Sequence, residues 1–199
     1  MIEIELKAVV TDLHGARRQA EQLGAKLTFA GRLEDRRYDR PDLSLAAIDH
    51  VLRVRVYRHG SALVSASIDW KGPSSMMGSY KEREEITTEI RSDPMQLGNI
   101  LERLGFIVTM QIDREIWQYE LHDAVVRFER YPRMDDLVEV EGTPRTIEEA
   151  IAALGLPRDS FTTERLPAFV QRYQSRTGSS AALSDAELRG GVRYDVSNA

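Results

Sequence analysis

The sequence predicts an α+β fold, an eight-stranded antiparallel β-barrel with helices packed outside it. Eight segments alternate apolar and polar side chains with the period of a β-strand. The amphipathic helices between them need an apolar surface to cover, and the outside of a barrel offers one. A strand, a capped helix and a long strand follow one another from residue 2 and again from residue 86. Two such halves suit a closed barrel, which has no exposed sheet edge.

Each expected strand carries apolar residues on one side. Leu52, Val54 and Val56 share one face of their segment, as Val126 and Phe128 do in theirs. The expected strands cover 2–7, 27–38, 50–58, 62–71, 80–91, 107–119, 123–130 and 137–142. The stretch 72–79, which reads Gly-Pro-Ser-Ser-Met-Met-Gly-Ser, predicts a flexible loop between two of them.

Helices are expected at about 11–24, 94–105, 146–155 and 165–175. The first should begin at Thr11 or Asp12, with Thr11 as its N-cap. The second follows the capping residue Asp93 and has Pro94 in its first turn. The third is expected to stop at Gly155, since glycine commonly ends a helix.

The 199 residues suffice for one domain, expected over 1–175. The tail, 176–199, is rich in Gly, Ser and Ala, and we expect it to be mobile and outside the core, apart from a weak helical stretch near Leu183 to Leu188. No apolar stretch approaches membrane-spanning length and no leader is evident, which favours a cytoplasmic protein without a membrane partner. A homodimer is compatible with the sequence.

Composition narrows the chemistry. The chain has no cysteine, which excludes disulfides and thiolate metal sites. Its net charge is −5, and its basic residues alternate with acids instead of forming a Lys/Arg-rich run. This pattern argues against a nucleic-acid partner and favours a local site for a small anion.

The polar faces of the strands carry paired acids and bases. Glu3, Glu5 and Lys7 point to one side of the first strand. The same spacing places Arg53 with Arg55, Lys81 with Arg83 and Glu85, Arg127 with Glu129, and Glu139 with Glu141. Acids cluster on the first and last strands and bases on those between. One interpretation is the wetted face of an open sheet with cross-strand ion pairs. A solvated face needs no such partition, so we favour a site for a divalent metal and a polyphosphate.

Six motifs, in order and spacing, resemble one known family. They are Glu3-x-Glu5-x-Lys7, Leu52-Arg53-x-Arg55, Trp70-Lys71-Gly72-Pro73, Lys81-x-Arg83-x-Glu85, Asp113-Arg114-Glu115 and Val138-Glu139-Val140-Glu141-Gly142. Over about residues 1–175 the chain resembles the CYTH family, which includes class IV adenylyl cyclases and thiamine triphosphatases and is also called the triphosphate tunnel metalloenzymes. The resemblance departs at Glu129, where relatives often carry aspartate, and at a C-terminal Ser-Tyr motif, for which Thr162-Thr163-Glu164 and Tyr173 are loose substitutes.

The resemblance implies a barrel that encloses a triphosphate and Mg²⁺ or Mn²⁺. The implied metal ligands are Glu3, Glu5, Glu85, Glu139 and Glu141. The implied substrate-binding residues are Lys7, Arg53, Arg55, Lys71, Lys81, Arg83, Arg114 and Arg127. Lys7 and Lys71 are also the expected catalytic residues.

Three functions remain open on the sequence. The first is metal-dependent hydrolysis of a triphosphate, such as tripolyphosphate, ATP or thiamine triphosphate. The second is a class IV adenylate cyclase, which makes cyclic AMP and pyrophosphate and needs a shaped base pocket. Only Tyr38, Asp39 and the stretch 72–79 suggest such a pocket, so hydrolysis is preferred, although Tyr38-Asp39 and Lys71-Gly72-Pro73 resemble the cyclase branch. The third is a non-catalytic polyphosphate- or nucleotide-binding module, which has less use for the full set of glutamates.

Overall fold

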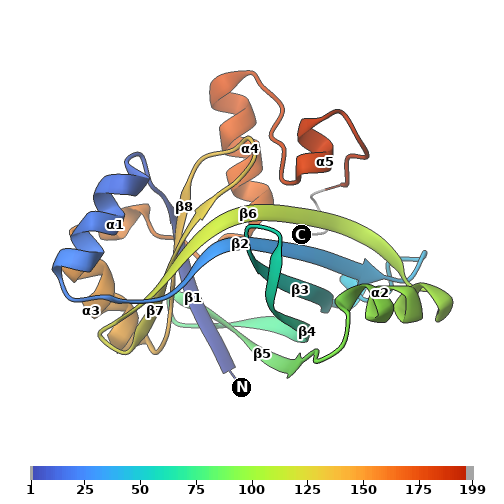
Figure 1. The fold of residues 1–199 in the computed structure, drawn as a ribbon. Helices are drawn as coiled ribbons and strands as arrows, with labels where there is room; N and C mark the ends of the chain where they lie inside the picture. The colour runs from blue at the N-terminus through green and yellow to red at the C-terminus, as the bar shows by residue number, and fades with distance from the viewer. Residues whose placement is uncertain (1, 196–199) are drawn as a thin grey trace.

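A computed structural model describes residues 2–195, and within them eight strands close into a single antiparallel barrel (Figure 1). The strands are β1 (Ile2–Val9), β2 (Lys26–Asp39), β3 (Val51–His59), β4 (Ala62–Met77), β5 (Tyr80–Glu89), β6 (Ile107–Leu121), β7 (Ala124–Arg130) and β8 (Leu137–Glu141). Around the barrel they follow the order β1-β5-β4-β3-β2-β6-β7-β8, and β8 pairs with β1 to close it. The predicted fold class is confirmed.

Five helices lie outside or across the end of the barrel in the described chain. They are α1 (Leu13–Gln22), α2 (Pro94–Arg103), α3 (Pro144–Leu154), α4 (Leu166–Thr177) and α5 (Asp185–Leu188), with 3-10 turns at Ala46–Ile48 and Arg158–Ser160. Figure 1 shows α1 and α3 together on one side of the barrel and α2 on the other. Within residues 2–195, no helix is long and apolar enough to cross a membrane.

Three apolar clusters follow from the two-residue period of the strands. The outward residues Leu6, Val126 and Val140 meet Ala20 of α1 and Ile151 of α3 in the largest cluster. A second cluster lies under α2, and a third joins α4 to one end of the barrel. Because the outward faces are apolar and covered, the charged faces of the same strands turn inward.

The repeated strand–helix–strand order of the sequence is visible in the barrel. One unit is β1-α1-β2 and the other is β5-α2-β6. Their first strands pair with each other, as do their long second strands. The two repeated units are therefore joined to each other through both their first and their second strands.

Two helix starts differ from the sequence-based expectation. Asp12, and not Thr11, caps α1, since its carboxylate accepts a hydrogen bond from the Gly15 backbone N–H at 2.8 Å. Helix α3 begins at Pro144, two residues earlier than expected, because Thr143 is its N-cap and Thr146 forms the reciprocal half of a capping box. Two threonines three residues apart each fit the cap, so the pattern alone does not separate them.

The expected loop at 72–79 is wrong. Strand β4 runs on to Met77 and pairs with β5, with Ser74 opposite Arg83, so that the turn is confined to Gly78 and Ser79. The ladder shifts register between Lys71 and Ser74, around Pro73, which has no N–H to donate. A proline in a strand-like stretch thus marks an irregularity here and not the end of the strand.

The expectation that the tail lies outside the core is also wrong for 181–188. Ala182 pairs with Arg133, and the Leu183 carbonyl accepts a hydrogen bond from the Asp113 N–H at 2.8 Å. Leu183 is 2% exposed and packs in the α4 cluster. The helical stretch near 183–188 is confirmed as α5. Residues 196–199 of the predicted tail lie outside the described residues.

Candidate active site

The inward faces of the strands line one cavity of about 680 Å³. All of the predicted site residues border it: Glu3, Glu5, Lys7, Arg53, Arg55, Lys71, Lys81, Arg83, Glu85, Arg114, Arg127, Glu139 and Glu141. The expectation that these charged faces converge is therefore confirmed, whereas the role of each residue stays a prediction. Within the described chain, ten Lys and Arg and eight Asp and Glu side chains line the cavity, so its formal charge is positive in a protein of net charge −5.

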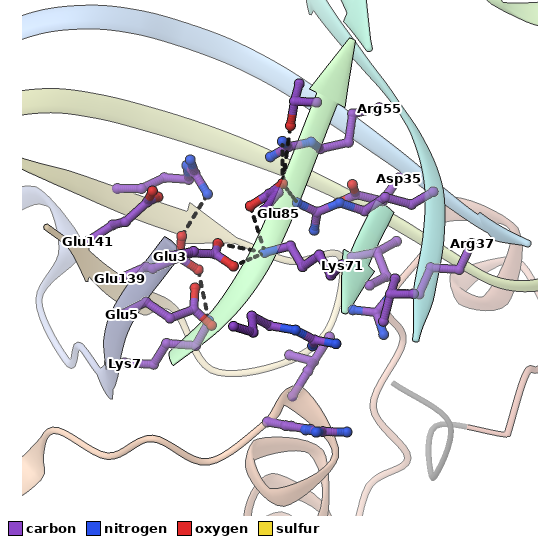
Figure 2. Close-up of a pocket in the computed structure, with 18 of the residues that line it drawn as sticks. Glu3, Glu5, Lys7, Asp35, Arg37, Arg55, Lys71, Glu85, Glu139 and Glu141 are labelled. Carbon is purple, nitrogen blue, oxygen red and sulfur yellow. Dashed lines mark hydrogen bonds and ion pairs between the residues drawn. The ribbon is translucent and has the colours of Figure 1, made fainter. Parts of the chain in front are cut away.

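The cavity has two chemically different walls. Strands β1 and β8 are neighbours and carry Glu3, Glu5, Glu139 and Glu141, whereas β2 and β3 lie on the opposite side of the closed order, with β3 three positions from β1 and β2 three positions from β8. Those two strands present Arg37, Arg53 and Arg55 to the interior. Figure 2 shows the β1 and β8 glutamates on one side of the cavity and Asp35 and Arg37 on the other, with Lys71 reaching between them.

On the acidic wall, Lys7 joins two carboxylates. Its ammonium contacts Glu5 and lies 3.0 Å from Glu139. Burial opposes the charge of Lys7, but Glu139 and Glu5 outweigh it and raise the pKa of the ammonium above its usual value. Glu139 also accepts a hydrogen bond from Arg127 at 2.7 Å. Lys7 and Arg127 thus hold in place the acids that the sequence predicted as metal ligands.

Glu141 marks the crowding of carboxylates on this wall. It lies opposite Glu5 in the β1–β8 ladder. Burial raises the pKa of Glu141 to about 7, and Glu139, Glu3 and Glu5 add to the rise. A hard divalent cation relieves the electrostatic repulsion between closely spaced carboxylates, and carboxylate oxygens suit Mg²⁺ or Mn²⁺ as ligands.

The donor chemistry therefore fits a metal, although the acids are engaged with basic side chains. Over residues 2–195, no three carboxylate or histidine side chains converge as a metal site would require. Lys7 occupies Glu5 and Glu139, while Lys71 occupies Glu3. A cation at this wall would have to replace these ammonium groups.

Lys71 spans the middle of the cavity. Its ammonium contacts Glu3 of β1 and lies 3.2 Å from Glu85 of β5. Glu85 in turn accepts a hydrogen bond from Arg53 at 3.2 Å and one from Arg55 at 3.4 Å. Because one lysine touches acids on two strands, Lys71 links the acidic wall to the arginines.

The arginine pair of β3 is oriented by a fully buried acid. Asp69, on β4 and 0% exposed, accepts a hydrogen bond from Arg53 Nε at 2.9 Å and also contacts Arg55 Nε. Burial would raise the pKa of Asp69, but Arg53 and Arg55 lower it below its usual value. The two guanidinium groups are thus held side by side, with Nη atoms directed toward Glu85.

Arg114 is the most enclosed of the predicted phosphate-binding residues. It donates to Glu129 at 2.9 Å and contacts Asp35, and these two acids are themselves almost fully buried. Tyr131 donates to Glu129 at 2.6 Å. Arg114 therefore spends its hydrogen-bonding capacity on acids of β2 and β7, which points to a structural share in its role.

One end of the cavity is closed by α4. Met110, Leu137 and Tyr131 of the barrel pack on Leu166 and Phe169 of this helix. Lys81 lines the cavity among other basic side chains. Burial lowers the pKa of Lys81 to about 8, and the positive charges of Lys7 and Arg165 add to the fall.

Arg165, the residue before α4, ties the helix to the rim of the cavity. Its guanidinium donates to Asp49 at 2.6 Å and to Ser74 at 3.0 Å. Arg83 donates to the carbonyls of Gly72 and Asp49, each at 2.9 Å. The start of α4, the β2–β3 connection and β4 thus meet through side-chain contacts.

Several cavity residues escaped the sequence analysis. Asp35 and Arg37 line the cavity, and Asp69 contacts two of its arginines; all three follow the same two-residue alternation as the predicted residues and could have been found by extending it along their strands. Arg165 lies before a helix and no alternation indicates it. His50 also lines the cavity.

The proposed base-contacting pair at the mouth is wrong. Tyr38 faces outward into the cluster beneath α2. Asp39 accepts hydrogen bonds from the backbone N–H groups of Arg40, Leu45 and Ala46 and so shapes the β2–β3 connection. Neither side chain reaches the cavity, because Tyr38 has the outward phase of β2 and the carboxylate of Asp39 is used by its own loop.

Comparison with known proteins supports the fold and the family. A family model described as the CYTH domain matches residues 1–149. A protein from Pyrococcus horikoshii is 24% identical, with 84% of this chain and 98% of that one covered and a TM-score of 0.67. A proposed adenylate cyclase from Vibrio parahaemolyticus is 16% identical, with 86% and 98% covered and a TM-score of 0.73. A proposed adenylyl cyclase from Hippeastrum with a dominant triphosphatase activity is 16% identical, with 92% and 98% covered and a TM-score of 0.60. No curated protein sequence matches the chain.

Proposed function

The chain belongs to the CYTH family, and from that premise we propose that it is a divalent-metal-dependent enzyme that hydrolyses an inorganic or organic triphosphate inside the barrel. The observation that carries the proposal is the facing of two walls across one cavity. Glutamates of β1 and β8 lie on one side and arginines of β2 and β3 on the other. A polyphosphate would need both walls. The arginines would neutralise its charge on one side, and a cation held by the glutamates would neutralise it on the other.

The acidic wall is the proposed metal site. Glu3, Glu5, Glu139 and Glu141 would hold Mg²⁺ or Mn²⁺, with Glu85 as a further candidate on the neighbouring strand β5. When bound, such a cation would supply positive charge to the phosphate oxygens and favour ionisation of an attacking water. The carboxylates also offset most of the positive charge of the cavity when phosphate is absent.

Lys7 and Lys71 are proposed to change partners when the site fills. Each ammonium now contacts two glutamates, Lys7 contacting Glu5 and Glu139 and Lys71 contacting Glu3 and Glu85. If a cation were bound to those oxygens, Lys7 and Lys71 would be free to donate to phosphate oxygens in the same cavity.

Arg53 and Arg55 would bind phosphate without moving far. Asp69 holds their Nε atoms from behind, so that their Nη groups face the interior. Donors fixed before the substrate arrives need little reorganisation as charge develops in the transition state, which is the property that makes such sites catalytic.

Cyclase activity is the alternative suggested by the names of two similar structures. Cyclisation requires the nucleoside to be folded toward the α-phosphate by a shaped pocket. The outward position of Tyr38 removes the one aromatic side chain that the sequence offered for the base. Hydrolysis requires only an aligned phosphate and a water, so it is preferred. A purely binding role is disfavoured because the four glutamates of β1 and β8 all face the cavity.

The decisive experiment is a substrate panel. Purified protein would be incubated with tripolyphosphate, ATP or thiamine triphosphate, each with Mg²⁺ or Mn²⁺, and phosphate, pyrophosphate and cyclic AMP resolved by chromatography. We expect phosphate release without a cyclic product. Cyclic AMP with stoichiometric pyrophosphate would assign the cyclase reaction, and tight binding without turnover would assign a binding module.

A matched pair of variants links the activity to the cavity. Lys71→Met removes the central ammonium and should lower the rate of hydrolysis by about 100-fold or more. Lys26→Met makes the same change at a side chain that is 78% exposed and should leave the rate within about twofold of wild type. Equal rates for the two variants would show that the activity does not arise in this cavity.

A further inference from the structure

Arg37 differs from the other arginines on the inner face of the barrel. Its Nε and Nη1 atoms are buried, and no hydrogen-bond partner for them exists in the part of the chain that the structure describes. The other inward arginines of this wall are engaged, as Arg53 is with Asp69 and Arg114 with Asp35. An unpartnered buried guanidinium is costly, so its retention calls for an explanation.

The surroundings of Arg37 are themselves cationic. In the β2–β3 ladder Arg37 lies directly opposite Arg53. Burial lowers the pKa of Arg37 to about 10, and Arg53, Arg114 and Arg83 add to the fall, opposed by Asp35. Asp35 is already in contact with Arg114. Asp35 is thus a nearby counter-charge, but among the described residues no acceptor bonds Nε or Nη1 of Arg37, and an anion entering the cavity would supply one.

Arg37 also lies near the end of the cavity that α4 covers. Its partner on the β6 side is Met110, which packs with Leu166 and Phe169 of α4. Arg83 and Arg165 line the same cavity. Figure 2 places Arg37 across the cavity from Glu5 and Glu139, so a ligand that reaches it extends away from the proposed metal wall.

We infer that Arg37 is a further substrate-binding residue that binds an unesterified phosphate group at the α4 end of the cavity. The inference rests on the proposed function, since it assumes that a polyphosphate occupies the barrel. A guanidinium with free Nε and Nη donors matches two oxygens of one phosphate group, which a single ammonium does not. The group could be the third phosphate of a triphosphate or the fourth of a longer linear chain.

Binding to metal-free protein tests this subsite apart from catalysis. Calorimetric titrations in EDTA would compare pyrophosphate, tripolyphosphate and tetrapolyphosphate with wild type, Arg37→Gln and Arg40→Gln. Arg40 is exposed on the same segment, so its variant controls for the loss of one charge. Loss of a charge-assisted hydrogen bond should weaken binding by about tenfold or more in Arg37→Gln.

The chain length at which the loss first occurs identifies the phosphate that Arg37 binds. A loss for tripolyphosphate but not for pyrophosphate assigns the third phosphate, and a loss for tetrapolyphosphate alone assigns the fourth. The inference is overturned if Arg37→Gln binds all three ligands as Arg40→Gln does, if it loses the same factor for all three, or if wild type binds none.

Thermal unfolding without ligand separates this role from a structural one. Because Nε and Nη1 of Arg37 have no hydrogen-bond partner among residues 2–195, Arg37→Gln should unfold at the same temperature as wild type or higher, and gain less on addition of tripolyphosphate. A lower unfolding temperature with unchanged anion affinity would make Arg37 a structural residue. Anion binding through Arg37 in a protein that hydrolyses no triphosphate with any metal would contradict the proposed function and leave the subsite standing.

Discussion

Replacing Arg114 by methionine should destabilise the protein far more than replacing a surface arginine. Arg114 is 7% exposed and pairs with Asp35 and Glu129, each 2% exposed at the side chain. Methionine fills much of the same volume but leaves two carboxylates buried without their cation. Breaking a buried pair by removing one partner costs about 3–5 kcal/mol. For a chain of this size that corresponds to a fall of about 6–20 °C in unfolding temperature.

The loss should depend on pH in a defined direction. Burial would raise the pKa of Asp35, but Arg114 and Arg53 lower it below its usual value. Wild type therefore keeps this stabilisation at every pH above about 4, the ordinary pKa of an aspartate. Without Arg114 fewer cations oppose the burial of Asp35, so its pKa should rise and the folded variant should bind more protons than folded wild type. Its deficit relative to wild type should shrink as the pH falls from about 8 to about 5.

Denaturant titrations at both pH values would measure these differences, with Arg145→Met as the control. Arg145 is 74% exposed in its pair with Glu149, and its loss should cost no more than about 0.5 kcal/mol. Restoring charge balance in Arg114→Met by adding Asp35→Asn should recover part of the loss. The reasoning is refuted if Arg114→Met unfolds within about 0.5 kcal/mol of wild type at pH 8.

Three further changes test other parts of the structure. Glu141→Gln should raise the Mg²⁺ concentration needed for half-maximal hydrolysis by about tenfold or more while leaving unfolding unchanged. Glu89→Gln, at an exposed acid, should change neither quantity, and equal metal titrations for the two variants would remove Glu141 from the metal site. Leu183→Ala should lower the free energy of unfolding by about 2–5 kcal/mol because this side chain is buried under α4, and a denaturant titration identical to wild type would show that the tail packs only loosely. Asp49→Asn keeps a residue that tolerates the left-handed backbone there (φ 58°) but removes the charge that holds Arg165, so hydrogen exchange at the start of α4 should quicken; unchanged protection would mean that other contacts fix the helix.

The barrel and its contents could be predicted because one signal encodes both. Alternation along a strand separates Leu6 from Lys7 and Val140 from Glu141, and so assigns the outside and the inside at once. The same phase would have revealed Arg37 had it been followed along the whole of β2. Closure followed from the repeat, whose two units supply neighbouring strands.

What alternation cannot supply is the partner of each charge. Arg37 and Arg114 are both inward arginines on long strands, yet in the described part of the chain Nε and Nη1 of Arg37 have no hydrogen-bond partner, whereas Arg114 pairs with two acids. That difference arises from residues far apart in sequence, such as Asp35 and Glu129, which the barrel order brings together. The packing of the tail could not be predicted for a related reason. A few buried residues such as Leu183 anchor a segment whose composition is otherwise that of a linker.

The ion pairs inside the barrel explain how a highly charged cavity can exist before any ligand enters it. Lys71 with Glu3 and Lys7 with Glu139 bring opposite charges of the two proposed ligand sets into contact. Each pair satisfies the desolvated groups of the empty protein, and each can separate when a cation and a polyanion arrive together. A polyanion alone would bind the lysines but leave the glutamates without a cation. A metal alone would bind the glutamates but leave the lysines without an anion. Occupation of the two walls should therefore be mutually reinforcing, which follows from the contacts themselves and requires no change in the fold.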